Sequence, residues 1–137
     1  MVPLVLAVLV AASLAAPVAP ARILDGFRPP EGAYGAGHRG VDLAAAPDQP
    51  VFSPIAGTVR WIGRVAGKDV ITISDGSRNV SLEPVRSSIP IGGAVRRGEL
   101  IGAVGRGGHC DARCVHVGLR IEGRYARPFA THARLLP

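Results

Sequence analysis

The chain has 137 residues, of which 47% are hydrophobic and 19% are charged, and its formal net charge is +6 at pH 7. This length has room for about one ordinary domain, and the 18 glycines and 12 prolines argue against a helical fold. All charged residues lie after position 21, and a basic protein of this kind is attracted to anionic polymers and surfaces.

Residues 1–21 are predicted to be an export signal. Residues 2–16 are almost wholly apolar, and Ala19-Pro20-Ala21 places small residues where signal peptidase requires them. No Lys or Arg precedes the apolar stretch, so retention as an anchor is the alternative. A stable membrane span is not expected, because a span needs about 20 apolar residues and prolines interrupt this stretch. We therefore expect a secreted or envelope-associated protein, which export separates from nucleic acid as a partner.

After the signal, residues 22–36 are rich in Pro and Gly and are predicted to form an extended arm. From residue 50 onward, apolar and β-branched segments alternate with turn residues, which is typical of short strands. The expected strand segments are 51–64 around Gly57, 70–73, 79–85, two short runs within 93–104, and 114–121. No segment after the signal has a helical period. The prediction is an all-β domain over residues 37–137, built as an antiparallel β-sandwich or open barrel.

The segment 114–121 has the clearest strand pattern. Its apolar residues alternate with polar residues or glycine, and side chains switch faces at every position of a strand. The residues expected to point into the core are Val115, Val117, Leu119 and Ile121. His116 falls on the opposite face, where a metal ion or water can reach it. The alternative is an ordinary surface histidine.

Two cysteines, Cys110 and Cys114, lie four positions apart. In an oxidising compartment such a pair is expected to form a disulfide. Closing so short a loop stabilises a fold by roughly 2 kcal/mol in the chain-entropy model. The alternative makes both cysteines ligands of a small structural zinc site together with His109 and His116.

Three residues can form a hydrolytic metal site: His38, Asp42 and His116. Two imidazoles and a carboxylate fill three corners of a zinc tetrahedron and leave the fourth open to water. In an extended segment His38 and Asp42 share a face, and Gly40 between them keeps that face clear. Taken alone, Asp42 can also be explained as a turn-capping carboxylate.

Four short motifs containing these residues follow one another between residues 37 and 121. They are His38-x-Gly40-x-Asp42, Pro50-Val51-x-Ser53-Pro54-x-Ala56-Gly57-x-Val59, Val95-x-x-Gly98-x-Leu100-Ile101-Gly102, and His116 on a strand. In this order they resemble the lysostaphin/LytM-type zinc endopeptidases of bacterial cell walls. The resemblance implies an antiparallel β fold with a groove across one sheet and a single Zn²⁺ held by His38, Asp42 and His116. It also implies that peptide cross-links of peptidoglycan are the substrate.

The chain departs from that family at two positions. The family's last motif is His-x-His, and its first, catalytic histidine is replaced here by Cys114. The family also has a histidine in an earlier strand, whereas residues 80–84 contain none. Two groups are candidates for the missing proton-transfer role, His109 before the predicted disulfide and Glu83 beside the vacated position. Each has an alternative, as a loop histidine and as a solvated turn residue.

Three functions compete. The leading hypothesis is an exported zinc metallopeptidase that cleaves peptidoglycan cross-links with metal-activated water, with anionic cell-wall polymers as further candidate partners. The second is a catalytically inactive family member that binds cell-wall peptide or regulates a cell-wall hydrolase. The third is a small β carrier or adaptor whose histidines are incidental, and it predicts no bound metal.

Overall fold

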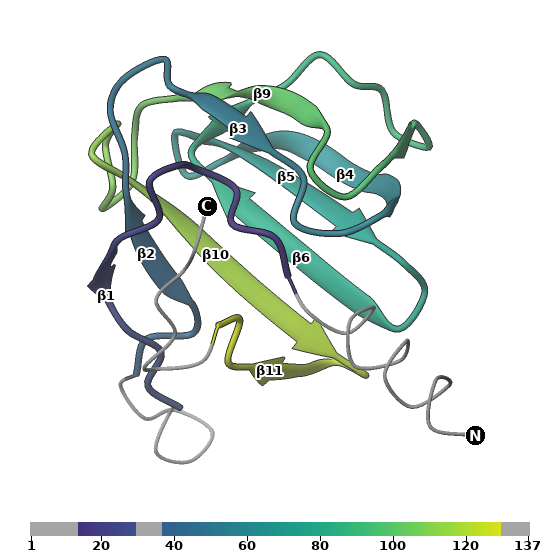
Figure 1. Cartoon of the computed structure of the whole chain (residues 1–137), viewed down its shortest axis with the longest axis horizontal. Coiled ribbons are helices and arrows are strands. Elements are labelled where there is room, and N and C mark those ends of the chain that lie inside the picture. The colour runs from purple at the N-terminus through teal and green to yellow at the C-terminus, as the bar shows by residue number, and fades with distance from the viewer. Residues whose placement is uncertain (1–13, 30–36, 130–137) are drawn as a thin grey trace.

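The computed structural model describes residues 14–29 and 37–129, and every regular element in these residues is a β-strand (Figure 1). The larger sheet has eight strands in the order β1-β2-β10-β6-β5-β4-β8, with β11 paired to β10. Their bounds are β1 Ile23–Asp25, β2 Val41–Ala44, β10 Cys114–Ile121, β6 Arg78–Glu83, β5 Lys68–Ser74, β4 Gly57–Val65, β8 Ala94–Val95 and β11 Arg124–Ala126. The smaller sheet has the order β3-β9-β7, formed by Pro50–Phe52, Leu100–Val104 and Val85–Arg86.

All strand pairs are antiparallel, which confirms the predicted fold class. Each segment expected to be a strand contains one. The segment 51–64 covers most of β3 and all but the last residue of β4, and the segment 79–85 covers most of β6 and the first residue of β7. Between β3 and β4 the hydroxyl of Ser53, which is buried, donates to the Ile55 carbonyl at 2.7 Å. The sequence analysis missed β1, β2 and β11, because three or four residues are too few to show an alternation.

The core is formed by apolar side chains of both sheets, and β3 and β9 cross over the larger sheet (Figure 1). Alternate residues of the central strands supply most of it, including Ile71 and Ile73, Val80 and Leu82, and Val115, Val117 and Leu119. Each fully buried side chain of this kind contributes roughly 1.5–3 kcal/mol of transfer free energy. Ile121 was expected in this set and is 41% exposed. It lies at the end of β10, where the chain turns into β11. The alternation of apolar and polar residues therefore continues to a part of the strand that the core side chains do not cover.

Residues 14–20 pack against the smaller sheet, although they fall within the predicted export signal 1–21. Val18 is completely buried in the core. The Phe52 amide donates to the Pro17 carbonyl at 2.8 Å, and the Ala15 amide donates to Pro54 at 2.9 Å. Residues 1–13 lie outside the described residues, and the boundary at residue 21 stays a prediction.

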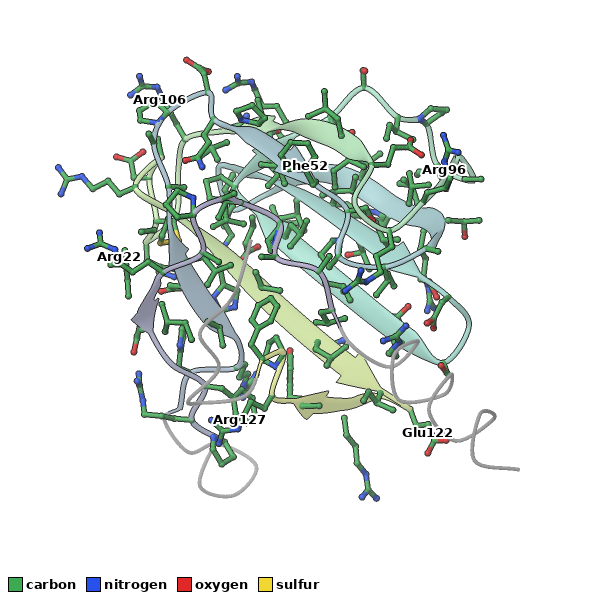
Figure 2. The ribbon with its side chains drawn as sticks, in the orientation of Figure 1. Arg22, Phe52, Arg96, Arg106, Glu122 and Arg127 are labelled. Carbon is green, nitrogen blue, oxygen red and sulfur yellow. A yellow bond between two sulfur atoms is a disulfide. The ribbon has the colours of Figure 1, made fainter. Side chains whose placement is uncertain are left out.

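The predicted arm 22–36 begins with β1, an edge strand that pairs with β2. Residues 30–36 of the arm, and residues 130–137 of the predicted domain, lie outside the described residues. Within the described ranges no helix is long and apolar enough to cross a membrane. Figure 2 shows how side chains surround both sheets, with the labelled arginines Arg22, Arg96, Arg106 and Arg127 spread along the periphery of this view.

Candidate metal centre

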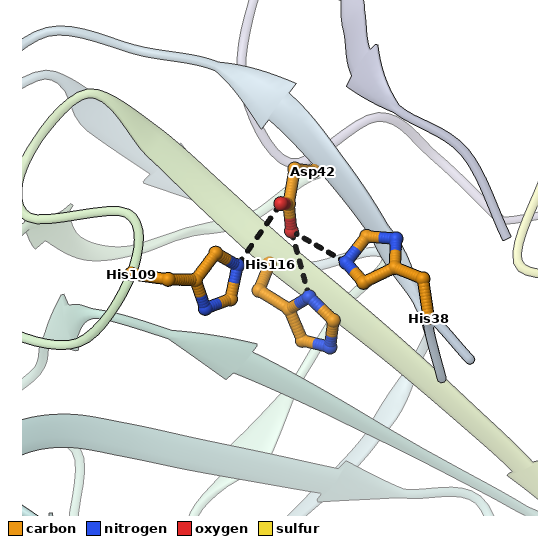
Figure 3. A group of neighbouring side chains, drawn as sticks. All are labelled: His38, Asp42, His109 and His116. Atoms are coloured by element: carbon orange, nitrogen blue, oxygen red, sulfur yellow. Dashed lines mark hydrogen bonds and ion pairs between the residues drawn. The ribbon is translucent and has the colours of Figure 1, made fainter. Parts of the chain in front are cut away.

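The candidate site forms where β2 and β10 run side by side. Asp42 in β2 lies directly opposite His116 in β10. His38 lies just before β2 and is held by a pair of backbone hydrogen bonds with Arg28. His109 comes from the loop that leads into β10, next to the Cys110–Cys114 disulfide. Figure 3 shows the three imidazoles gathered around the single carboxylate.

Asp42 is the centre of this cluster. Its Oδ1 lies 2.7 Å from His116 Nδ1 and 3.2 Å from His38 Nε2. Its Oδ2 lies 2.9 Å from His109 Nε2. One potential ligand atom from each of the four residues can be chosen so that all four lie within 4.8 Å of one another. A single cation can therefore reach all four residues.

The tautomer of His38 is determined by its backbone partner. Its Nδ1 lies 2.8 Å from the Gly26 carbonyl oxygen, which can only accept, so Nδ1 carries the hydrogen. In a neutral imidazole Nε2 is then a lone pair. This Nε2 is buried without a hydrogen-bond donor and faces a carboxylate oxygen. Two electron-rich atoms in this position require a cation between them, either a proton or a metal ion, and the donor set fits zinc.

Gly40 leaves room for the His116 ring. A Cβ built on Gly40 would lie 2.6 Å from His116 Nε2 and would also overlap the Val117 carbonyl oxygen. Every other residue would displace the imidazole or the backbone of β10. The sequence predicts that Gly40 keeps the face shared by His38 and Asp42 clear, and the space that it leaves is occupied by the His116 ring.

The Asp42 side chain is charged in spite of its burial, with the residue only 5% exposed. Burial alone would raise the pKa of its carboxyl group, but hydrogen bonds from His116 and His109, and their charges, hold the pKa below its ordinary value. When the imidazoles are neutral, as metal ligands must be, this buried carboxylate supplies the negative charge that favours a cation.

Glu83 lies at the end of β6, directly across the sheet from His116. Its carboxylate forms an ion pair with Lys68, with Oε1 3.1 Å from Nζ. Both residues and His116 line a cavity of about 980 Å³ over the strands β4, β5, β6 and β10. The other lining residues include Arg39, Arg60, Trp61, Arg120 and Tyr125. This cavity is a groove that begins at the candidate site.

The structure brings together all three residues that the sequence suggested as metal ligands. The disulfide between Cys110 and Cys114 is present as predicted, so neither sulfur is a thiolate and the alternative cysteine–histidine zinc site is not formed here. His109 also joins the cluster through its contact with Asp42, which the sequence did not predict because the two residues are brought together only by the fold. The Gly26 carbonyl and Lys68 were also missed, since neither carries a motif.

The fold and the site define an antiparallel β domain with a histidine–aspartate cluster at one end of a groove. The chain matches the sequence model of Peptidase family M23 over residues 36–128 and belongs to this family. This confirms the resemblance stated above.

The chain is also similar to individual proteins. An uncharacterized protein of Mycobacterium tuberculosis is 40% identical over 85 residues, which are 60% of this chain and 34% of that protein, so the chain spans about a third of this relative. A zinc-containing peptidase from Vibrio cholerae superposes with a TM-score of 0.72 at 22% identity, covering 86% of this chain and 40% of that one. Lysostaphin from Staphylococcus simulans superposes with a TM-score of 0.66 at 23% identity, covering 81% and 48%. At these identities the two structures show the shared fold alone.

Proposed function

We propose that this chain is an exported zinc metallopeptidase-like domain that acts on peptide cross-links of bacterial peptidoglycan. Peptidases of family M23 are zinc enzymes. The observation that carries the proposal is the convergence of His38, Asp42 and His116, with the buried His38 Nε2 aimed at a carboxylate and supplied with no donor.

Each of the three proposed ligands contributes a different group to the zinc site. His38 offers Nε2 because its Nδ1–H donates to the Gly26 carbonyl, and His116 offers the Nδ1 that faces Asp42. Asp42 supplies the negative charge. Zinc bound there would act as a Lewis acid that polarises a scissile carbonyl and activates a water molecule. Glu83 is the proposed proton-transfer group, and its ion pair with Lys68 keeps its carboxylate at the groove next to His116.

The groove is the proposed substrate site. It combines an exposed aromatic side chain, Trp61, with hydrogen-bonding groups such as Thr72 and Ser81 along the sheet. An extended peptide can lie across such a sheet face with one peptide bond close to His116. The predicted export signal would deliver the domain to the cell envelope, where peptidoglycan is found.

The zinc content of the purified chain tests the metal site. We expect one zinc per chain in the wild type and less than a tenth of this in the His116→Ala and Asp42→Asn variants, after equal dialysis. Asp48→Asn is the matched control, because Asp48 is an exposed aspartate that pairs with Arg86 and touches no site residue. A wild type without zinc, under conditions where zinc is supplied, would contradict the proposal.

Hydrolysis is tested separately, on purified peptidoglycan. We expect release of new amino termini by the wild type, and a loss of about 100-fold or more in Glu83→Gln with zinc content unchanged. Lys68→Gln is the companion variant, because it removes the ion pair and leaves the carboxylate in place.

A second candidate is a family member that binds cell-wall peptide without cutting it. It is favoured by Cys114, which stands where the family resemblance places a catalytic histidine and is joined to Cys110 in a disulfide. This function predicts that wild type and Glu83→Gln both sediment with peptidoglycan and that neither releases amino termini.

A further inference from the structure

We propose that His109 is a fourth protein ligand of the metal, delivered to the site by the disulfide-closed loop between β9 and β10. The inference rests on the proposed zinc site and adds a ligand that the family resemblance does not supply. It makes the resting centre a closed set of three imidazoles and one carboxylate.

The His109 ring lies against the carboxylate of Asp42. Its Nε2 lies 2.9 Å from Asp42 Oδ2, on the other side of the carboxylate from the oxygen that faces His38 and His116. In a zinc tetrahedron with bonds of about 2.0–2.1 Å, neighbouring ligand atoms are about 3.3 Å apart. The separations from the Asp42 carboxylate are 2.7 Å and 3.2 Å at Oδ1 and 2.9 Å at Oδ2. One ligand atom from each of the four residues lies within 4.8 Å of the other three, so closing by about 1.5 Å or less would give the ligand spacing of one zinc ion.

The three imidazole rings lie close together in edge-on arrangements. The ring centroids of His38 and His116 are 4.9 Å apart, and His109 lies 5.3 Å from His116 and 6.1 Å from His38. All pairs meet at steep interplanar angles of 61–83°, so the rings are not stacked on one another. In Figure 3 the three rings approach the Asp42 carboxylate from three directions.

The loop that carries His109 is anchored to the sheet. Cys110 and Cys114 are both buried, and Cys114 is the first residue of β10, so the disulfide fixes the residue next to His109 to the sheet. The Ala45 amide donates to the Arg113 carbonyl at 2.9 Å, which ties the loop to the end of β2. The Gly107 amide donates to Asp111 Oδ1 at 2.9 Å within the loop.

The His109 side chain itself is 51% exposed, so packing does not determine its direction. Its position is set by the anchored backbone on one side and by Asp42 on the other. A ligand of this kind can leave while the loop stays in place. We therefore expect His109 to compete with water for the fourth metal position, a role opposite to the proton-transfer role that the sequence suggested.

Cobalt(II) binding to the full chain tests this proposal. Cobalt replaces zinc in such sites, and a four-coordinate cobalt ion absorbs visible light far more strongly than a five- or six-coordinate one. We expect strong visible absorption in the wild type, and in His109→Ala a weaker spectrum with an affinity at least about tenfold lower by chelator competition. Arg106→Ala is the matched control, because Arg106 is an exposed residue of the same loop and should change neither quantity.

The role of the disulfide needs a second variant. The double variant Cys110→Ser, Cys114→Ser keeps His109 and removes the disulfide that anchors its loop. We expect an affinity between those of the wild type and His109→Ala, with circular dichroism showing that the β fold is retained. An affinity equal to that of the wild type would show that the disulfide does not hold His109 at the metal site.

The outcomes separate this inference from the proposed function. If wild type and His116→Ala both fail to bind cobalt, the metal site itself is wrong. If the wild type binds and His109→Ala keeps the same spectrum and affinity, the fourth ligand is wrong and the zinc site stands. At saturating zinc, a ligand role predicts equal or faster hydrolysis in His109→Ala. A large loss of hydrolysis with an unchanged spectrum would restore the proton-transfer role.

Discussion

At the scale of single residues, the candidate site depends on one carboxylate and on the three imidazole nitrogens turned toward it. Asp42 has three imidazole nitrogens within 3.2 Å, and its pKa is held below the ordinary range by hydrogen bonds from His116 and His109 in spite of burial. The charge of the carboxylate is therefore available to a cation over the whole neutral pH range. The hydrogen bond from His38 to Gly26 adds direction, because it leaves only one nitrogen of that ring free to bind.

Gly40 gives the sharpest single-residue prediction. We expect Gly40→Ala to lower zinc affinity at least about tenfold and to lower the free energy of unfolding by about 1–3 kcal/mol, because its Cβ would overlap the His116 ring and the Val117 carbonyl. Metal titration and thermal unfolding of the same preparation measure both effects.

Gly118→Ala is the control, since Gly118 is in the same strand as His116 and a Cβ there would meet only ordinary van der Waals contact. Equal metal affinity in Gly40→Ala and Gly118→Ala would show that Gly40 does not maintain the site.

At the scale of elements, the short strand β2 connects the site to the rest of the domain. It pairs with β10 on one side and with β1 on the other, so residues from the predicted arm complete the sheet around Asp42. The segment 14–20 extends this N-terminal contribution, because it packs on β3 and inserts Val18 into the core. The structure therefore makes residues on both sides of position 21 part of one folded unit.

The contribution of this segment is measurable. We expect Val18→Ala to lower the free energy of unfolding by about 1.5 kcal/mol, at roughly 0.8 kcal/mol for each buried methylene-sized group removed. A chain that begins at Arg22 should lose more, because it also lacks the hydrogen bonds to Pro17 and Ala19. Urea unfolding of the three chains gives these differences.

Leu24→Ala is the control for Val18→Ala, because Leu24 lies in β1 with most of its side chain in solvent. If the chain that begins at Arg22 were as stable as the wild type, signal cleavage after Ala21 would leave the folded domain intact.

At the scale of the whole molecule, the sequence predicts the fold class because alternation in long strands is a local signal. The alternation of Val115, His116 and Val117 predicts which side chains point into the core and which point to the opposite face of the sheet. The contacts of His109 follow from the packing of a glycine-containing loop against β2, which no local pattern encodes. Ile121 shows the limit of the alternation rule. The apolar pattern continues to the end of the strand, but the side chains that cover the rest of β10 do not reach Ile121.

The distribution of charge gives the last prediction. The net charge of +6 is spread over the surface, but Arg39, Arg60, Lys68 and Arg120 all line the groove, where Glu83 is the acidic residue. An anionic cell-wall polymer should therefore bind preferentially along this face, and its binding should weaken as salt screens the charges. We expect Arg60→Glu to lower affinity for a purified phosphate-bearing wall polymer by roughly fivefold at low salt, which corresponds to about 1 kcal/mol. Arg106→Glu changes the net charge equally outside the groove, so an equal loss in both variants would mean that the polymer senses the total charge alone.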